Sequence, residues 1–320
     1  MVNKYMAYNK YNYRKKTVSI DSGKHSFKMY WGDNRLIFDN KIEEIKEKSP
    51  VYHTIVEFNG KLYSVAGSGE RSWEASKDDE LHQVSIYYGL TRIGMNEDCL
   101  LNLVVGTPAL KFKNPIAKQS YRDRIYNDGK AEIVVNGRKH SLLINDVLVL
   151  PESSGIIYQI ENYAEYSKEL IGVVDIGGLN AQGIVYNRTN IIQQTIFTEN
   201  SGANILEVKV KNALNEGTNN NFQLFEISHI LEKLDRETEE IQRIVRDVME
   251  EHLNQILETM KANNWNIGHM VIVFTGGGSL LLKDLIQEKG FTVSESSVWD
   301  NVCGWYNLAI NYFGVDELYE

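Results

Sequence analysis

The chain reads Leu170-Ile-Gly-Val-Val-Asp175-Ile-Gly177-Gly178-Leu-Asn180 just past its middle, which is an apolar strand followed by an aspartate and a glycine turn. Much earlier it reads Thr17-Val-Ser-Ile-Asp21-Ser-Gly23-Lys24, with the same features in the same order. Glycines let backbone N–H groups approach phosphate oxygens closely, and aspartates can hold a hydrated Mg²⁺. We therefore predict that the two turns face each other across a nucleoside triphosphate.

A third glycine turn, Thr275-Gly-Gly-Gly278, follows the apolar strand Val271–Phe274 and precedes a predicted helix. Open α/β sheets bind ligands where their strands end, so this turn is expected at the same cleft. The chain contains no Gly-x-x-x-x-Gly-Lys-Ser/Thr motif and no strand followed by Gly-x-Gly-x-x-Gly. These absences argue against a P-loop ATPase and against a Rossmann dinucleotide site.

Composition narrows the class of protein. A length of 320 residues suits two domains, and 42 % hydrophobic with 24 % charged residues is typical of a soluble globular protein. No apolar run approaches the roughly 20 residues of a membrane helix, and residues 1–16 lack the apolar stretch of a signal peptide. Cys99 and Cys303 are the only cysteines, which fits a reducing cytoplasm. The net charge of −9 argues against direct binding to nucleic acid.

The two halves of the chain repeat one order of elements. Thr17–Ile20 and Phe27–Trp31 flank the first glycine turn as a predicted hairpin, and further hairpins are expected at Asn59-Gly60 and Asn136-Gly137. In the second half, Ile171–Asp175, Gln182–Tyr186 and Ile191–Thr198 repeat the strand, turn, strand, strand order of the opening. This is a weak internal duplication within an α/β chain.

Apolar residues at three- and four-residue steps predict the helices. The predicted helices are Asp79–Arg92, Ile156–Tyr166, Gly202–Leu214, Leu224–Leu234, Glu237–Ala262, one beginning at Leu280, and Trp299–Phe313. His252 lies on the apolar face of the long helix, and we interpret it as a packed histidine rather than a ligand.

The turns Asp21–Lys28, Asp175–Asn180 and Thr275–Ser279 together resemble the phosphate and adenosine loops of the actin, sugar kinase and heat-shock chaperone superfamily. The resemblance spans residues 17–313 and implies a duplicated, two-lobe actin-like (ribonuclease H-like) α/β fold with the nucleotide in the interdomain cleft. Residues 1–166 with 299–320 would form the first lobe, with 1–16 as a flexible arm. Residues 167–298 would form the second lobe.

The resemblance also implies the site. Lys28 stands at the place of the family's phosphate-binding lysine, and Lys24 replaces a small or polar residue. Asp21 and Asp175 would hold the waters of a bound Mg²⁺. The nucleotide-binding residues so implied are Ser22, Gly23, Lys24, Lys28, Gly177, Gly178, Leu179, Asn180, Gly202, Asn204, Thr275, Gly276, Gly277 and Gly278.

Three further segments resemble the plasmid-segregating actins of the ParM type: Gly106-Thr-Pro108, Leu150-Pro151-Glu152-Ser153 and Asp300-Asn301-Val-Cys-Gly304-Trp-Tyr306. By this resemblance, Glu152 would position or partly deprotonate the attacking water, together with the catalytic Asp21 and Asp175. A carboxylate that favours a helix N-terminus is the alternative interpretation of Glu152. The expected protein hydrolyses ATP or GTP, forms homopolymeric filaments and reaches a plasmid centromere through a DNA-binding adaptor.

Other functions of the same superfamily stay open. A small-molecule kinase would share the two facing aspartate turns, although no convincing sugar-binding segment is found. A chaperone-like ATPase would need a peptide-binding domain for which the chain has no room. A membrane-bound shape or division actin needs an apolar anchor, and residues 1–16 are polar, basic and rich in tyrosine. The sequence does not distinguish ATP from GTP.

Overall fold

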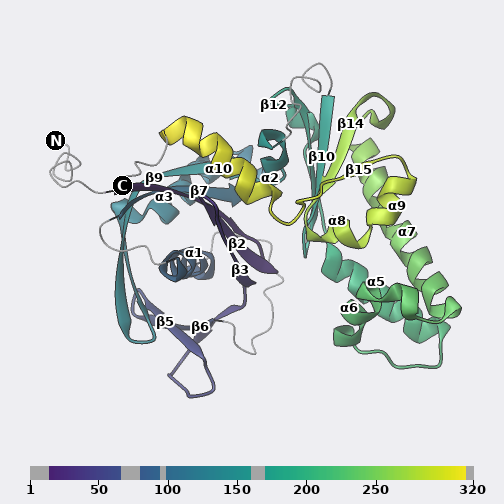
Figure 1. Cartoon of the computed structure of the whole chain (residues 1–320), viewed down its shortest axis with the longest axis horizontal. Helices are drawn as coiled ribbons and strands as arrows, with labels where there is room; N and C mark the ends of the chain where they lie inside the picture. The colour runs from purple at the N-terminus through teal and green to yellow at the C-terminus, as the bar shows by residue number, and fades with distance from the viewer. Residues whose placement is uncertain (1–13, 66–79, 94–98, 160–169, 315–320) are drawn as a thin grey trace.

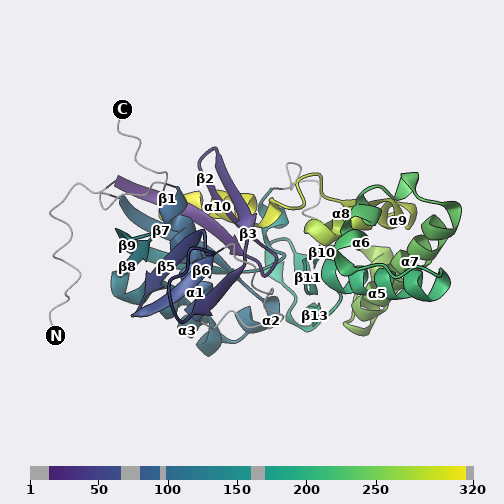
Figure 2. The same cartoon turned by 90° about the horizontal axis from the view of Figure 1, so that it is seen from below.

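A computed structural model describes residues 14–65, 80–93, 99–159 and 170–314. These residues form two lobes that lie side by side along the longest axis (Figures 1 and 2). Each lobe is built on its own β-sheet. The strands before residue 152 belong to the first sheet and those after residue 169 to the second.

The described strands of the first lobe form a nine-stranded sheet in the order β3-β2-β1-β7-β9-β8-β5-β6-β4. Their bounds are β1 Arg14–Ser22, β2 Ser26–Trp31, β3 Asn34–Asp39, β4 Ile42–Ile45, β5 Thr54–Phe58, β6 Lys61–Val65, β7 Cys99–Thr107, β8 Lys130–Val135 and β9 Arg138–Pro151. β7 runs parallel to both β1 and β9 in the middle of the sheet. Its nearly continuous apolar sequence suits that doubly covered position.

The sheet encloses helix α1 (Glu80–Arg92), which lies beneath it with β5 and β6 on its far side (Figure 1). Every residue from His82 to Leu90 is buried. The polar ones are satisfied: Gln83 donates to the Arg124 carbonyl at 2.7 Å, and Ser85 donates to Asn40 at 2.7 Å. The first core therefore forms around a helix that is covered on all sides.

Two helices of the first lobe follow β7, α2 (Ala109–Phe112) and α3 (Pro115–Tyr126). α3 begins at the cap Asn114, whose side chain accepts from the backbone N–H groups of Ile116 and Ala117. The last helix, α10 (Asp300–Phe313), returns to the first sheet, where Trp305 and Ala309 pack on Val104 and Leu150. The chain thus crosses between the lobes twice, after β9 and before α10.

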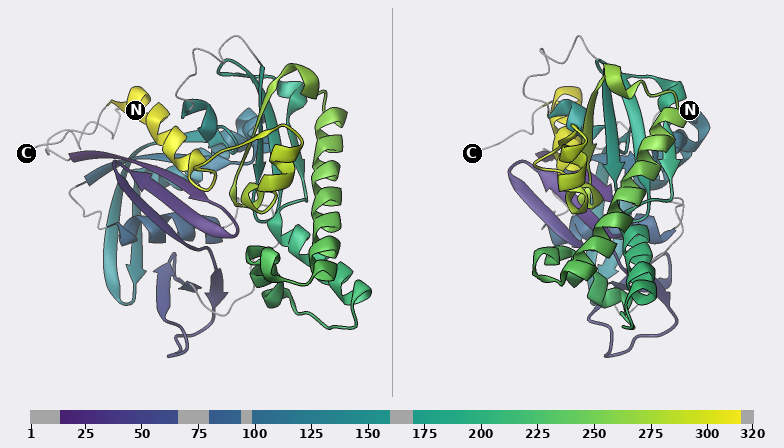
Figure 3. Two further views of the ribbon diagram at one scale, coloured as in Figure 1. Left: turned by 45° about the vertical axis from the view of Figure 1, so that its right-hand side comes forward. Right: turned by 90° about the vertical axis from the view of Figure 1, so that its right-hand side faces the viewer.

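The second sheet has the order β12-β11-β10-β14-β15, with β13 paired to β11. The strands are β10 Leu170–Ile176, β11 Ala181–Asn187, β12 Asn190–Ile191, β13 Phe197–Glu199, β14 Val271–Thr275 and β15 Thr292–Val293. The helices are α5 Ala203–Gly217, α6 Leu224–Glu232, α7 Glu239–Ala262, α8 Gly277–Leu281 and α9 Lys283–Glu288. Figure 3 shows the long α7 running beside this sheet.

Side chains alternate between the two faces of β10. Val174 and Ile176 join the helix-covered core, whereas Ile171 and Val173 point to the opposite face. That opposite face packs on Ala109, Ile156 and Ile157 of the first lobe. A small apolar core therefore fastens the two lobes to each other below the cleft.

The predicted hairpins are confirmed, with β1 paired to β2, β5 to β6 and β8 to β9. His252 is fully buried, with its Nε2 3.0 Å from the Ser201 carbonyl oxygen, as expected of a packed histidine. Several strands extend beyond their predicted ends, because pairing with neighbouring strands lengthens them; among the helices, α5 runs on to Gly217, whereas α6 and α7 are shorter than predicted. The sequence interpretation missed β3, β4 and α3.

Four predictions need correction. The arm of residues 1–16 is too long, because Arg14–Lys16 already pair with Cys99–Leu101 of β7; residues 1–13 lie outside the described residues. Ile191–Thr198 is not one strand, since a 3-10 turn, Gln193–Thr195, separates β12 from β13. The helix expected over 156–166 is a 3-10 turn, Gly155–Tyr158 (η3), as far as it is described. The helix expected from Leu280 begins earlier, as α8 and then α9.

Candidate functional site

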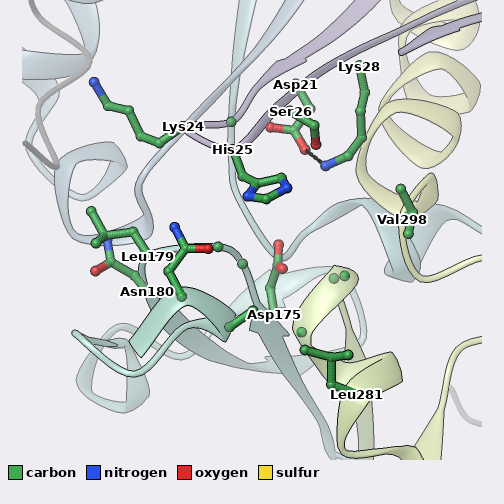
Figure 4. A pocket seen from close by; sticks show the side chains of 18 of the residues that line it. Asp21, Lys24, His25, Ser26, Lys28, Asp175, Leu179, Asn180, Leu281 and Val298 are labelled. Atoms are coloured by element: carbon green, nitrogen blue, oxygen red, sulfur yellow. Dashed lines mark hydrogen bonds and ion pairs between the residues drawn. The ribbon is translucent and has the colours of Figure 1, made fainter. Parts of the chain in front are cut away.

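A cavity of about 760 Å³ lies between the lobes. Most of the residues predicted to bind nucleotide line it, and Figure 4 shows several of them reaching in from both sides. The predicted residues on its wall are Asp21, Gly23, Lys24, Lys28, Glu152, Asp175, Gly177, Gly178, Leu179, Asn180, Asn204, Gly276, Gly277 and Gly278. Two turns far apart in the sequence and the third glycine turn therefore meet at one cleft.

The first turn connects β1 to β2 and holds an ion pair. Asp21 and Lys28 are direct cross-strand partners, so their side chains share a face, and Lys28 Nζ donates to Asp21 Oδ2 at 3.3 Å. Burial opposes the charge on Lys28, but the carboxylates of Asp21 and Asp175 outweigh that effect and raise its pKa. Lys24 instead extends away from this pair (Figure 4). Lys28 is thus a permanent cation inside the cavity.

The second turn rests on the N-terminus of α5. Within the turn, the Gly177 N–H donates to the Asn180 carbonyl at 2.9 Å. At the start of α5, the Gly202 N–H donates to the Leu179 carbonyl and the Asn204 N–H donates to the Gly178 carbonyl. Asp175 is the penultimate residue of β10, just before this turn, and is buried. Burial, then the charges of Asp21 and Glu152, raise the pKa of Asp175 to about 7. A cation in the cavity would relieve this unfavourable accumulation of negative charge.

The third turn approaches Asp175 from behind. Gly276 has φ +85°, and a Cβ on it would lie 2.2 Å from Asp175 Oδ1. The preceding Thr275 is the parallel-strand partner of Asp175, and its hydroxyl donates to Asp300 Oδ2 at 2.5 Å. The glycine turn consequently packs against the Asp175 carboxylate and restricts its position, while the backbone of the turn lines the cavity.

Glu152 follows the last residue of β9 and enters the cavity from the first lobe. Its N–H donates to the Thr107 carbonyl at 2.8 Å, which continues the β7–β9 pairing by one residue. Its Oε2 accepts a hydrogen bond from Gln182 Nε2, and Gln182 Oε1 accepts from the Ala109 N–H at 3.2 Å. Gln182 thus orients a buried carboxylate that comes from the opposite lobe.

Three predicted residues do not line the cavity. Ser22 turns toward α1, with its Oγ 3.2 Å from that of Ser85 and accepting from Asn40. Thr275 faces Asp300, as described above. Gly202 lies directly behind the second turn, where a Cβ would be 2.5 Å from the Leu179 carbonyl carbon. These residues support the cavity wall from outside.

Several cavity residues were not anticipated. His25, Gln182 and Asn301 lie near the carboxylates, and Glu207, Ser228, Leu231 and Glu232 line the part formed by α5 and α6. Gln182 could have been found from the sequence, because it is the cross-strand partner of Asp175 in the β10–β11 hairpin. The Glu207–Ser228 contact, at 2.8 Å between Oε1 and Oγ, joins two helices and leaves no signal in the sequence.

The described residues contain no group of three or more His, Cys, Asp or Glu side chains already arranged around a metal position. Asp21, Glu152 and Asp175 nevertheless line the same cavity, and hard cations such as Mg²⁺ take oxygen ligands and keep several waters. The donor set therefore fits Mg²⁺ bound mainly through water. Within the same described ranges, no helix combines the length and apolar character that crossing a membrane requires.

Comparisons with known proteins support the fold. Residues 19–155 match the family model for the N-terminal domain of actin-like proteins. The Alp12 filament structure has a TM-score of 0.71 and 23% sequence identity, with 94% of this chain and 99% of that chain covered. No curated protein matches this sequence.

Two further structures are similar at lower identity. The archaeal actin homolog Ta0583 in complex with ADP has a TM-score of 0.74 and 16% identity, covering 92% of this chain and 99% of that one. A 15-stranded ParM filament from Clostridium botulinum has a TM-score of 0.71 and 16% identity, covering 93% and 99%. These matches confirm the resemblance predicted from the sequence: the chain has the two-lobe, actin-like α/β fold that ParM and Alp proteins also have.

Proposed function

We propose that the chain binds a nucleoside triphosphate with Mg²⁺ in the interlobe cavity, hydrolyses it and assembles into filaments. One observation carries the proposal: Asp21, Lys28 and Glu152 of the first lobe meet Asp175 of the second around a single cavity. A cation, three carboxylates and two glycine turns are the groups that phosphate binding and hydrolysis require.

The phosphates would lie between the two aspartate turns. Lys28 would neutralise one phosphate oxygen, and backbone N–H groups of the turns would approach the others. Asp21 and Asp175 would hold Mg²⁺ through its waters, and the ion would spread the negative charge of the phosphates. The nucleoside would extend past Gly276–Gly278 toward Asn204 and Glu207, which line the same cavity.

Glu152 would handle the attacking water. Gln182 holds one carboxylate oxygen of Glu152, so the group has a fixed direction. As the water oxygen bonds to the γ-phosphorus, the bond from that phosphorus to the bridging oxygen breaks. Glu152 orients the water and accepts its proton.

The filament part of the proposal is supported by the fold. Similar structures include an Alp12 filament and a ParM filament. Closure of the lobes on nucleotide would favour the polymer, and hydrolysis would weaken it. We extend the proposal to plasmid segregation in the cytoplasm through a DNA-binding adaptor, since the net charge of −9 disfavours direct DNA contact.

Light scattering with ATP, GTP and their slowly hydrolysed analogues tests the proposal, with phosphate release measured in the same samples. The expected result is polymer with either nucleotide, which persists with the analogue and decays as phosphate appears. Nucleotide binding without polymer would contradict the proposed filament assembly. Phosphorylation of a sugar panel without polymer would identify a kinase instead.

A further inference from the structure

Asn301, in the first turn of α10, connects the two lobes through one side chain. Its Nδ2 donates to Asp175 Oδ2 at 2.9 Å. Its Oδ1 accepts from the Gly155 N–H at 3.4 Å. Asp175 belongs to the second lobe, and Gly155 ends the turn that carries Glu152, so a single amide touches both halves of the site.

The hydrogen-bonding groups on its two sides fix which way the Asn301 amide is oriented. An ionised carboxylate only accepts hydrogen bonds and a backbone N–H only donates them. Of the natural side chains of this size, only an asparagine offers a donor to Asp175 and an acceptor to Gly155 together. Aspartate at position 301 would keep the acceptor, lose the donor and add a like charge beside Asp175.

The same end of α10 also holds the neighbouring segments. Trp305 Nε1 donates to Ser154 Oγ at 2.7 Å, which anchors the turn after Glu152. Asp300 accepts from Thr275 in the third glycine turn and from Gln159 Nε2 at 3.2 Å. The first turns of α10 therefore contact Asp175, the third glycine turn and the turn that follows Glu152.

We propose that Asn301 is a positioning residue that couples the occupation of Asp175 by a cation and nucleotide to the ordering of the turn Pro151–Gly155. This inference rests on the proposed function. Binding at Asp175 fixes the carboxylate, the carboxylate fixes the Asn301 amide, and the amide fixes the Gly155 backbone. Loading of the second lobe then tightens the backbone of the turn that carries Glu152, while Gln182 holds the Glu152 carboxylate.

The test compares Asn301→Asp and Asn301→Leu with Asn307→Ala. Asn307 is a matched control, because it lies on the same helix and its Nδ2 donates to the Tyr158 carbonyl at 3.3 Å, but it is exposed and outside the cavity. The measurements are Mg²⁺–ATP affinity, single-turnover phosphate release at saturating ATP, thermal unfolding without ligand, and hydrogen exchange of a peptide spanning residues 151–159.

Wild-type chain should gain exchange protection over residues 151–159 when Mg²⁺–ATP binds. Asn301→Asp should weaken affinity roughly tenfold or more, since a hydrogen bond to a charged group is lost. At saturating ATP it should still bind yet lack the protection gain and release phosphate at least roughly tenfold more slowly. Asn307→Ala should behave as wild type. Asn301→Leu should lose protection over 151–159 even without ligand, because it also loses the bond to Gly155.

The outcomes separate the inference from the proposed function. Wild-type chain that neither binds nor hydrolyses nucleotide contradicts the function itself. Wild-type binding with an Asn301→Asp variant that keeps the protection gain and the release rate overturns the coupling alone. Equal loss of unfolding temperature in Asn301→Leu and Asn307→Ala, with unchanged phosphate release in both, would mean that Asn301 only packs the helix.

Discussion

His25 of the first turn and Gly178 of the second are in direct contact across the cleft. A Cβ on Gly178 would lie 2.8 Å from the Cβ of His25, closer than such atoms approach. The His25 ring occupies the space between the turns that carry Asp21 and Asp175 (Figure 4). The distance between the two turns is therefore set by the smallest possible residue at position 178.

We predict that Gly178→Ala separates the two turns and weakens phosphate binding. The added methyl group must displace backbone-anchored atoms of His25, and a misplacement of about 1 Å can cost up to about 100-fold in rate. Nucleotide affinity and kcat/KM for hydrolysis should therefore both fall, by roughly ten- to a hundredfold. Isothermal titration with Mg²⁺–ATP and a phosphate-release assay measure the two effects.

Gly177→Ala is the control for this change. A Cβ on Gly177 would be 3.4 Å from the Asn180 carbonyl oxygen, which is ordinary van der Waals contact. Similar losses in both variants would mean that the second turn tolerates no side chain at all. Only a selective loss in Gly178→Ala would support a contact between the turns.

We predict that Glu152→Gln binds nucleotide and polymerises but releases phosphate at least roughly 100-fold more slowly, since proton transfer by a positioned group contributes about that much. The variant keeps the size of the side chain and loses its basicity. Pelleting with ATP should give stable polymer, and single-turnover phosphate release should be slow. Unchanged hydrolysis would remove Glu152 from the reaction and favour a purely structural carboxylate.

The aspartate turns were predictable because local rules govern them. Apolar strands followed by Asp and Gly dictate both the hairpin and the position of the carboxylate at the strand end, and Asp21 and Lys28 follow as cross-strand partners. The meeting of the two distant turns was predicted from the strand, aspartate and glycine order that they share, and the resemblance supplied the two-lobe fold that brings them together. Glu152 required the resemblance as well, since one carboxylate after a proline is a weak signal.

Other contacts depend on tertiary packing and left no pattern in the sequence. Asn301 reaches Asp175 only because α10 returns from the second lobe to the first sheet, a path that single-helix periodicity cannot give. Ser22 and Thr275 were assigned to the nucleotide because they stand inside glycine turns, yet each side chain points to a partner behind the wall. The break at Gln193–Thr195 likewise depends on Thr195, whose hydroxyl accepts from the Val185 N–H in place of a strand partner.

We predict that Asp175→Asn stabilises the ligand-free chain above neutral pH. Burial raises the pKa of Asp175 in the folded chain to about 7, from the ordinary value of 3.8 for an aspartate. The folded state therefore binds a proton that the unfolded state has lost, and the stability from this group falls as pH rises from about 4 to 7. Asparagine avoids the ionised, buried carboxylate and keeps an acceptor for Asn301. The expected gain above pH 7 is a few kcal/mol.

Denaturant unfolding of both proteins in chelator, at pH 5 and pH 8, measures this gain. The difference in unfolding free energy should be larger at pH 8. The affinity for Mg²⁺–ATP should differ in the opposite direction and be higher for the wild-type chain than for Asp175→Asn. The reason is that the ionised carboxylate of Asp175 is the form that binds a cation. A variant that is less stable at pH 8 than wild type would contradict the charge accumulation at Asp175.

We predict that Gly276→Ala disrupts the site whereas Gly277→Ala does not. Gly276 has φ +85° and ψ 160°, a conformation that costs other residues about 1–3 kcal/mol, and its added Cβ would lie 2.2 Å from Asp175 Oδ1. The carboxylate must then move, so Mg²⁺-dependent nucleotide affinity should fall together with the free energy of unfolding. A Cβ on Gly277 meets nothing within 4 Å, and alanine suits the first residue of α8. Titration and denaturant unfolding of the two variants should therefore diverge, and equal behaviour would mean that Gly276 does not hold Asp175 in place.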